Sequence, residues 1–431
     1  MSSPRTTLPW PLVALFAAGY LAPYLLPTTV GRLDAGLPLT ATQAGAAGSA
    51  LLLGSASAGF LLAARVERFG ARPLARAGLA VAALGYGGAA LTTTVPAVVA
   101  GAVLGGFGSG TVTAVAASGI AAQRDPHRAS TAGLLGVSAL AGALYLTVPH
   151  LGPGHGLPLA AIALTALAVW PLTGRLPGRS PAAPVVREDR ARLPHLRAGL
   201  LLAAAMPFWS LAQNALWGVS GRIGLTQAHL TEAAVGVVFA VALGAGLLGV
   251  LGAGALGARL GPAVPIGAGT VLIAGCIALS ASATTLPVFA AGEIAWNALY
   301  PVVLSYVIGL AASLDPRGRW AVLVGSASSL GTAAGPLTGS LLSERAGFPG
   351  MGLVLAAGLL VVAVPMTAVA VRAGRRRTAA AGIRVVEIRA EAPVVEIPVV
   401  EIPVDTPAVP AERAAYDTAG PRQATAAPGP G

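Results

Sequence analysis

Long apolar blocks alternate with short polar loops along most of this chain, and the blocks are longer than the helices of a soluble core. A helix that spans a membrane needs about 20 apolar residues. We place twelve such segments, at residues 8–30, 42–64, 74–93, 96–121, 129–149, 157–174, 198–220, 232–256, 263–283, 286–312, 320–342 and 350–372. The pattern therefore predicts an all-α membrane protein with twelve transmembrane helices.

The polar positions between the blocks occur twice. Gly31-Arg32 returns as Gly221-Arg222 after 190 residues, and Gly45 returns as Gly236 after 191 residues. Two copies of a six-helix unit predict two pseudo-symmetric bundles that face each other across a cleft, which is an arrangement that alternating-access transporters use.

The repeat also sets the expected domain boundaries. We expect an N-terminal six-helix bundle over residues 1–174, a cytoplasmic linker over 175–197, a C-terminal six-helix bundle over 198–374 and a disordered cytoplasmic tail over 375–431. The tail repeats Val-Val-Glu-Ile from positions 385, 394 and 399, and Pro393, Pro398 and Pro403 flank the second and third copies. Regularly spaced prolines oppose both a helix and a central strand.

Composition and charge agree with a membrane protein. The chain is 55% hydrophobic and 10% charged, and its formal net charge is +11. Its basic residues are arginines, and they collect in alternate loops, after the second, fourth and sixth helices of each half. By the positive-inside rule both termini are cytoplasmic, so the basic excess reflects topology rather than nucleic-acid binding. We expect a multi-pass protein of the cytoplasmic (plasma) membrane, in contact with lipid and without a nucleic-acid partner.

Cysteine and histidine give no pattern for a metal or a cofactor. Cys276 is the single cysteine and lies inside an apolar segment. The histidines fall in loops or at helix ends without the spacing of metal ligands; they are His127, His150, His155, His195 and His229. We expect no disulfide, no metal site and no cofactor.

A short charged motif follows the second apolar segment of each half. The first copy runs over residues 63–72, and the second, over 254–261, has lost its acid. The motif resembles the signature G-x-L-x-D-R-x-G-R-R of the major facilitator superfamily. Its charges can form a latch between the bundles at the cytoplasmic side, or the arginines can serve topology alone. The candidate latch residues are Glu67, Arg68, Gly70, Arg72, Arg259 and Gly261.

The resemblance covers residues 8–372. It implies two six-helix bundles around a central cavity lined mainly by the first, fourth, seventh and tenth helices, as in bacterial drug and metabolite permeases with twelve helices. Members of such a group differ widely in substrate, so the fold alone does not identify the solute.

Glu293 is the one acid that we place well inside a membrane segment. A charged side chain near the bilayer centre costs about 2.5 to 3.5 kcal/mol on insertion scales, so it faces a cavity, finds a partner or stays protonated. These properties suit a residue that exchanges a proton during transport. The alternative is a structural hydrogen bond to a neighbouring helix.

Polar and aromatic residues share faces of the expected cavity-lining helices. Trp296, Asn297 and Tyr300 follow Glu293 at helical spacing. A few amides among aromatic rings make a pocket for a largely apolar ligand, although tyrosine and tryptophan also gather at membrane interfaces. The candidate cavity residues are Tyr20, Tyr24, Gln213, Asn214, Trp217, Trp296, Asn297 and Tyr300.

Arg32 and Asp34 follow the first apolar segment, and Arg222 is the repeat partner of Arg32. They can gate the outer mouth of the cavity or cap a helix end in water, and we favour the cap. The repeated pairs Asp125-Pro126 and Asp315-Pro316 are predicted to cap helix starts at the cytoplasmic side.

Together these features favour a monomeric secondary active transporter, not an enzyme, that moves a small organic solute in exchange with or together with protons. Aromatic residues and one acid, without an arginine inside the membrane, favour efflux of an apolar or weakly cationic compound. Uptake of a neutral metabolite such as a sugar is the alternative, as is a membrane sensor or scaffold that does not transport.

Overall fold

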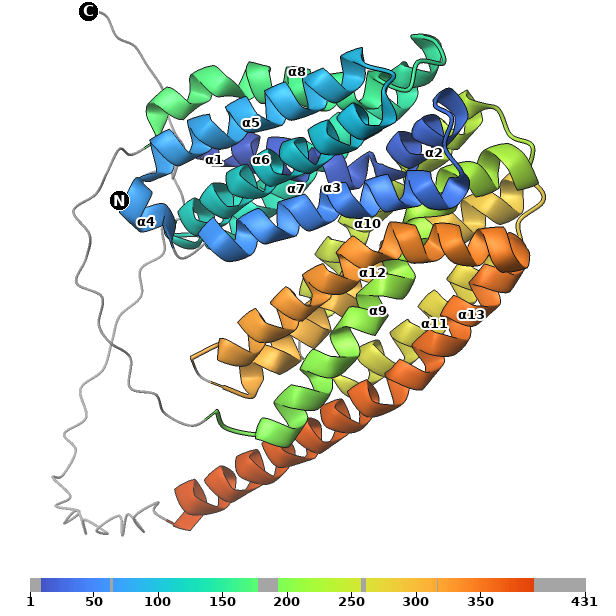
Figure 1. Cartoon of the computed structure of the whole chain (residues 1–431). Helices are drawn as coiled ribbons and strands as arrows, with labels where there is room; N and C mark the ends of the chain where they lie inside the picture. The colour runs from blue at the N-terminus through green and yellow to red at the C-terminus, as the bar shows by residue number, and fades with distance from the viewer. Residues whose placement is uncertain (1–8, 63–64, 177–192, 257–260, 316, 391–431) are drawn as a thin grey trace, which may run out of the picture. The chain divides into compact units, whose positions relative to one another are not determined.

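The computed structural model describes residues 9–62, 65–176, 193–256, 261–315 and 317–390, and its regular elements there are helices. The first half contains α1 (Trp10–Tyr24), α2 (Leu26–Gly36), α3 (Ala41–Leu62), α4 (Val66–Phe69), α5 (Ala71–Leu91), α6 (Val95–Ala121), α7 (Pro126–Thr147), η2 (Val148–His150), α8 (Leu157–Val169) and η3 (Trp170–Arg175). The second half contains α9 (Leu196–Arg222), the π-helical turn η4 (Ile223–Gln227), α10 (Glu232–Leu256), α11 (Ala263–Ala281), α12 (Leu286–Ser313) and α13 (Arg319–Ala390). Figure 1 shows these helices in chain order.

The predicted fold class is confirmed. Among the described residues, ten helical stretches are each long and apolar enough to cross a membrane, and the bent pair α1 and α2 adds one more. The stretch of 57 residues that begins at Arg319 holds two of the predicted segments. They are divided at Gly347, whose φ of 69° lies outside the helical region, and Figure 1 shows α13 turning back at its bend.

The first predicted helix is broken and longer than expected. The axes of α1 and α2 differ by 46°. Pro23 and Pro27 lie on either side of the break at Leu25, and each removes a backbone N–H from the helical ladder. Since α2 continues to Gly36, the charges of Arg32 and Asp34 are presented from a helix rather than from a loop.

The expected domain boundaries stay a prediction, and α13 continues to Ala390, past residue 375 where we expect the tail to begin. Proline does not oppose this helix, since the first proline of the repeated tail is Pro393. The linker residues 177–192 and the tail residues 391–431 lie outside the described part of the chain.

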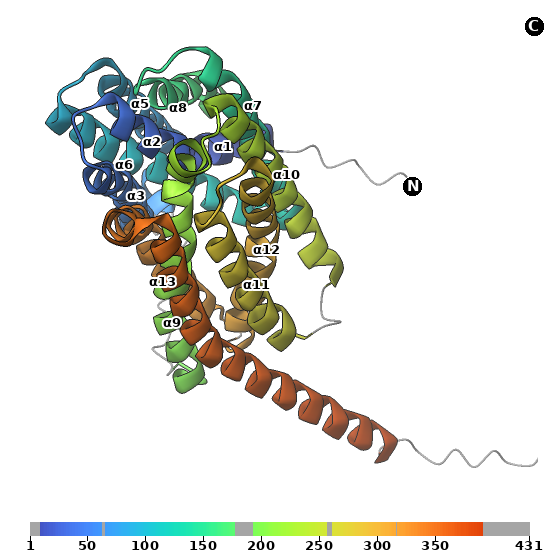
Figure 2. The same cartoon turned by 90° about the vertical axis from the view of Figure 1, so that its right-hand side faces the viewer.

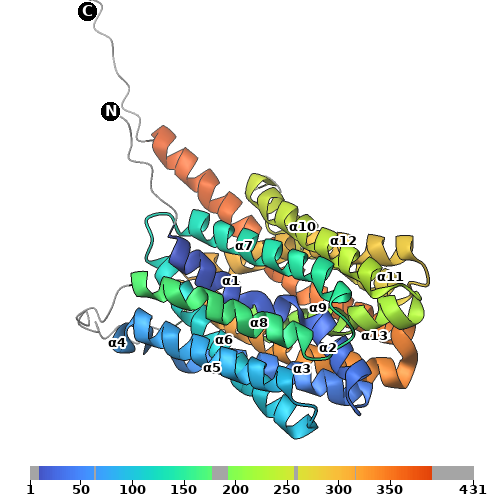
Figure 3. The same ribbon diagram turned by 90° about the horizontal axis from the view of Figure 1, so that it is seen from above.

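Within the first half, the helices pack closely through small residues. α6 packs along both α5 and α3, and α8 lies beside α5, as Figure 3 shows from above. A side chain on Gly85 of α5 would collide with the backbone of Gly105 in α6, so the absence of a Cβ permits this approach.

The two halves meet through repeat-related glycines. An added Cβ on Gly45 of α3 would lie 2.6 Å from the carbonyl oxygen of Pro336 in α13. An added Cβ on Gly236 of α10 would overlap the carbonyl oxygen of Tyr145 in α7. Gly45 and Gly236 are 191 residues apart (236 − 45), and so are Tyr145 and Pro336, whose carbonyls they approach (336 − 145). The same contact is therefore made twice: α3 of the first half packs on α13 of the second, and α10 of the second half packs on α7 of the first.

These contacts lie at one end of the helices, which we call the contact end: there α2 and α9 end and α3 and α10 begin. α2 packs against α9 at this end, and Figure 2 shows the two helices beside each other. Gly221 of α9 also lies against the carbonyl of Pro27.

We predict that Gly236→Ala opens the contact end, because the new methyl group must displace the backbone of α7. Overpacking of this kind costs about 1 to 3 kcal/mol. A distance between spin labels on the two halves at this end would measure the effect. Gly244→Ala, two turns further along α10, is the matched control because no atom lies within 4 Å of its Cβ position. Equal distance distributions for the two variants would contradict the prediction.

Candidate functional site

Aromatic rings from three helices of the second half form one connected cluster. The ring of Trp217 in α9 contacts Phe239 of α10 at 5.2 Å and Trp296 of α12 at 5.6 Å between centroids. Tyr300, one turn after Trp296, stacks on Trp209 at 5.4 Å. These separations lie in the range of favourable ring pairs. The structure thus brings together the predicted cavity residues Trp217, Trp296 and Tyr300, and adds Trp209 and Phe239.

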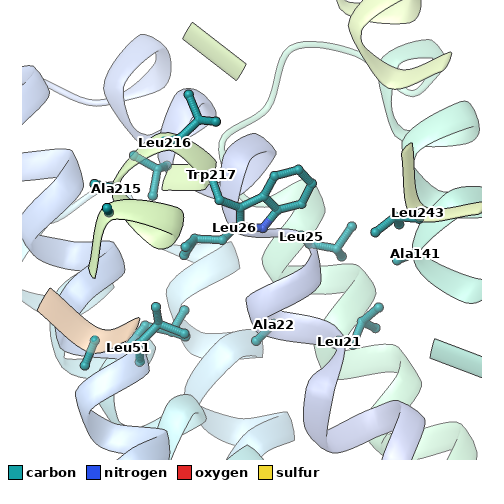
Figure 4. Close-up of a cluster of buried hydrophobic side chains, with 14 of the residues drawn as sticks. Leu21, Ala22, Leu25, Leu26, Leu51, Ala141, Ala215, Leu216, Trp217 and Leu243 are labelled. Carbon is teal, nitrogen blue, oxygen red and sulfur yellow. The ribbon is translucent and has the colours of Figure 1, made fainter. Parts of the chain in front are cut away.

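Trp217 connects this aromatic cluster to the first half. Its indole N–H donates a 3.0 Å hydrogen bond to the carbonyl of Pro23. In a continuous helix that carbonyl would accept from the N–H of residue 27, but Pro27 has none, so the carbonyl is free to accept from α9. Figure 4 shows Trp217 beside Leu25 and Leu26, at the break between α1 and α2.

Gln213 is buried beside the aromatic cluster with half of its amide engaged. Its Oε1 accepts a hydrogen bond from the indole N–H of Trp296. Because an indole nitrogen can only donate, this bond fixes which side of the amide carries the oxygen. The Nε2 group is buried and has no hydrogen-bond partner within the described part of the protein.

Two tyrosines of α1 face the aromatic cluster from the first half. The hydroxyl groups of Tyr20 and Tyr24 interact electrostatically with that of Tyr300. Tyr20 is 36% exposed and its ring packs on that of Phe16 in the same helix, at 4.5 Å between centroids. Tyr20 and Tyr24 of the first half therefore lie close to Tyr300 in α12 of the second half.

Glu293 lies inside the second half and is fully buried. Ser220 of α9 lies 2.8 Å from its Oε1, within hydrogen-bond distance. Its Oε2 and the hydroxyl of Ser280 in α11 make no hydrogen bond of good geometry among the described residues, although Ser280 lies near enough to interact with the carboxyl group. The acid thus has one hydrogen-bond contact to α9 and a second oxygen without one.

The two asparagines of the predicted set do not face the aromatic cluster with their amides. Asn214 donates to the carbonyl of Ser210 at 2.8 Å and to the hydroxyl of Thr332 in α13 at 3.3 Å. Asn297 donates to the carbonyl of Glu293 in its own helix at 3.0 Å. Helical spacing put these residues near the aromatic stripe but did not specify which neighbour each amide binds.

Arg32 makes an ion pair between the halves, so our preference for a helix cap in water is wrong. Its Nε lies 2.7 Å from Oε1 of Glu232, at the start of α10. Its two terminal nitrogens donate to the carbonyls of Gly154 and Val148, and 7% of its side chain is exposed. The repeat partner Arg222 lies 3.8 Å from Asp34, also across the halves.

The second repeat carries a related polar cluster at the contact end. Arg222 donates to the hydroxyls of Ser340 and Ser343 in α13. Thr42, which occupies the repeat position of Glu232 (232 − 42 = 190), donates its hydroxyl to the carboxylate of Glu344. The repeat of Arg32 as Arg222 was the signal in the sequence for these two polar clusters. The acids that bind the arginines could not be found in the same way, because the equivalent positions of the other half carry no acid.

A cavity of about 130 Å³ lies beside Arg32 and Glu232. Tyr145, Pro27 and Gly236 also line it. It is smaller than the roughly 300 to 1,000 Å³ of pockets that hold drug-sized ligands. We therefore assign it to the packing of the contact end rather than to solute binding.

Of the predicted latch residues, Arg72 binds its own half in this conformation. Arg72 donates from Nε and Nη2 to the carbonyl of Leu176, at 3.0 and 2.7 Å, while Glu67 and Arg68 are exposed. Gly70 has a φ of 89°, which favours glycine at the turn before α5. Arg259 lies outside the described residues, and Gly261 has a φ of 61°. A latch between the halves remains a prediction.

The repeated aspartates lie at the opposite end and bind backbone N–H groups there. Asp125 accepts from the N–H of Arg128 at the start of α7. Asp315 accepts from the N–H of Arg317 and from the guanidinium of Arg319, and the latter hydrogen bond lowers the pKa of the Asp315 carboxyl. Within the described residues, no group of three His, Cys, Asp or Glu side chains is placed to hold a metal ion.

Comparisons with known proteins give likeness in structure rather than in sequence. No family model and no curated protein matches the chain. The solved structure of the nucleoside transporter NupG matches with a TM-score of 0.64 and 15% identity, over 84% of this chain and 99% of that one. The human organic anion transporter MFSD10 (TETRAN) matches with a TM-score of 0.63 and 18% identity, over 85% and 100%.

A D-xylose-proton symporter matches with a TM-score of 0.66 and 15% identity, over 83% of this chain and 96% of that one. At these identities the comparisons establish the fold alone, and they agree with the predicted major facilitator fold.

We predict that Glu232→Gln loosens the contact end less than Arg32→Gln does. Glu232 is 34% exposed and can be solvated when its partner is lost, whereas Arg32→Gln also removes the hydrogen bonds from the guanidinium to the carbonyls of Gly154 and Val148. A hydrogen bond to a charged group contributes about 1.5 to 3 kcal/mol. The same spin-label distance measures both variants, and an equal or reversed order would contradict the assignment of Arg32 as the main contact.

Proposed function

We propose that this protein is a secondary active transporter that moves a small organic solute across the cytoplasmic membrane by alternating access. The observation that carries this proposal is the pair of repeat-related glycine contacts, Gly45 with Pro336 and Gly236 with Tyr145. Two halves that meet through equivalent contacts at one end can separate there and meet at the other by a rocking motion. The likeness in fold to transporters of nucleosides, organic anions and a sugar supports the same function.

The orientation follows from the arginines. The end opposite the contact end carries Arg68, Arg72, Arg124 and Arg128, which the positive-inside rule places in the cytoplasm. The contact end is then the outer side, and the described conformation is closed to the outside. In this orientation the two six-helix bundles are joined by a linker that lies in the cytoplasm with both termini.

Glu293 is the residue that we propose to carry the transported proton. It is fully buried and one of its oxygens has no hydrogen-bond partner among the described residues, so ionisation of the carboxyl group is unfavourable in this conformation. A change of conformation that exposes it would allow the proton to leave. Protonation and closure would then depend on each other, which is the requirement for coupling.

The solute that fits best is apolar or weakly cationic. The rings of Trp217, Trp296 and Tyr300 offer flat apolar surface, and the faces of aromatic rings attract cations. The amide nitrogen of Gln213 is a buried donor that a hydrogen-bond acceptor on the solute can satisfy. We therefore favour efflux of such compounds, with uptake of a neutral metabolite as the alternative.

Flux into proteoliposomes under an imposed pH gradient tests the proposal. Ethidium, xylose and uridine serve as probes of a lipophilic cation, a neutral sugar and a nucleoside. Gradient-driven flux of ethidium alone would support efflux of cations, and flux of xylose or uridine would support uptake of metabolites. No flux of any probe class from a broader library would oppose transport. A variant that lacks residues 391–431 should keep its flux, whereas loss of all function on this deletion would favour a scaffold.

We predict that Glu293→Gln abolishes flux driven by the pH gradient while the protein still folds. Glutamine has the shape of the neutral acid and cannot release a proton. The measurement compares accumulation with and without the gradient, and size-exclusion elution checks folding. Asp125→Asn is the matched control, because it neutralises an exposed carboxyl that accepts from a backbone N–H at the cytoplasmic end. Gradient-driven accumulation that survives in Glu293→Gln would refute the role of this residue.

A further inference from the structure

The hydroxyl group of Ser220 has two acceptors and a single hydrogen. Its Oγ lies 2.8 Å from Oε1 of Glu293 and 3.0 Å from the carbonyl oxygen of Leu216, one turn earlier in α9. Ser220 is fully buried. A serine hydroxyl donates one hydrogen bond at a time, so the two contacts cannot both be donated by Ser220.

The charge of Glu293 decides between the two acceptors. When the carboxyl group is ionised, it can only accept, and the hydrogen of Ser220 turns to Oε1 and leaves the carbonyl of Leu216. When the carboxyl group is neutral, its own proton lies on Oε1 and is donated to Oγ, and the hydrogen of Ser220 turns to Leu216. The proton that comes and goes is that of the carboxyl group, exchanged with water, while Ser220 keeps its own hydrogen and rotates.

The described arrangement fits the neutral carboxyl group. Oε2 of Glu293 has no hydrogen-bond partner among the described residues, and an unpaired ionised oxygen in the interior costs far more than an unpaired neutral one. The titratable groups that interact with Glu293 are Tyr145 of α7 and Cys276 of α11, and neither supplies a positive charge. Ser280, on the same side of α11, is neutral as well.

Ser220 lies in the last turn of α9, directly before the contacts between the halves. Gly221 follows it and packs against the carbonyl of Pro27 in α2. Arg222 comes next and reaches Asp34 and Ser340. The π-helical turn η4 begins at Ile223, so the hydrogen-bond ladder already changes at this point. A change in the bond to Leu216 therefore acts on the turn that carries the closing contacts.

We propose that Ser220 is the positioning residue through which the proton on Glu293 controls closure of the contact end. The neutral carboxyl group lets the hydroxyl of Ser220 donate to the carbonyl of Leu216, a side-chain contact of the kind that often bends a helix, and the contact end closes. The ionised carboxyl group withdraws that hydrogen bond, and the contact end opens. The proposal rests on the function proposed above, with Glu293 as the proton site.

The experiment follows closure as a function of pH in the full-length protein. Spin labels are placed at Leu151 and Leu286, which are exposed at the contact end on the two halves, in a Cys276→Ala background so that no other thiol reacts. The expected result is that the short distance gains population as the pH falls. Ser220→Ala should lose this pH dependence, and Ser220→Thr, which keeps the hydroxyl group, should retain it.

The matched control is Ser210→Ala, which removes a buried hydroxyl from the same helix where it donates to Ser328 rather than to Glu293. It should keep the wild-type response to pH. The proposal is overturned if Ser220→Ala responds like the wild type, or if Ser220→Thr behaves like Ser220→Ala. Glu293→Gln should stay closed at every pH. If this variant still titrates, the proton site itself is wrong, whereas a failure confined to the Ser220 variants leaves the proposed function standing.

Discussion

The rest of the structure depends on the close approach of backbone to backbone where the two halves meet. At Gly236 a helix of the second half lies directly on the carbonyl group of Tyr145, and at Gly45 a helix of the first half lies on the carbonyl group of Pro336 and on the small side chain of Ser340. This approach brings the charged ends of α2 and α9 within reach of acids on the opposite half. A larger residue at either position would keep those charges apart, so the glycines determine whether the polar contacts can form.

The aromatic cluster and the buried acid lie just inside this contact. Trp217 joins the cluster to α1, and Ser220, one turn later in the same helix, joins α9 to Glu293. The aromatic cluster and the proposed proton site in α12 are thus both in contact with α9.

The sequence predicts the fold well because the length and spacing of apolar segments directly reflect the membrane. The segment expected at 232–256 is α10 to the residue. The internal repeat in turn identified Arg32 and Arg222 as equivalent positions, although not their role. Glu232 has threonine at its repeat position, Thr42, so the repeat could not show which acid meets Arg32. Pairing across halves is a tertiary property that a periodic pattern does not contain.

The break between α1 and α2 links separation of the halves to the entry of water between them. Because Pro27 has no N–H, the carbonyl of Pro23 depends on the indole of Trp217 for its hydrogen bond. If the halves separate, this oxygen and the indole N–H of the buried Trp217 both lose the hydrogen bond that joins the halves. The loss is tolerable where water molecules enter and bond to both groups. Parting of the halves and wetting of the space between α1 and α9 should therefore be a single cooperative event.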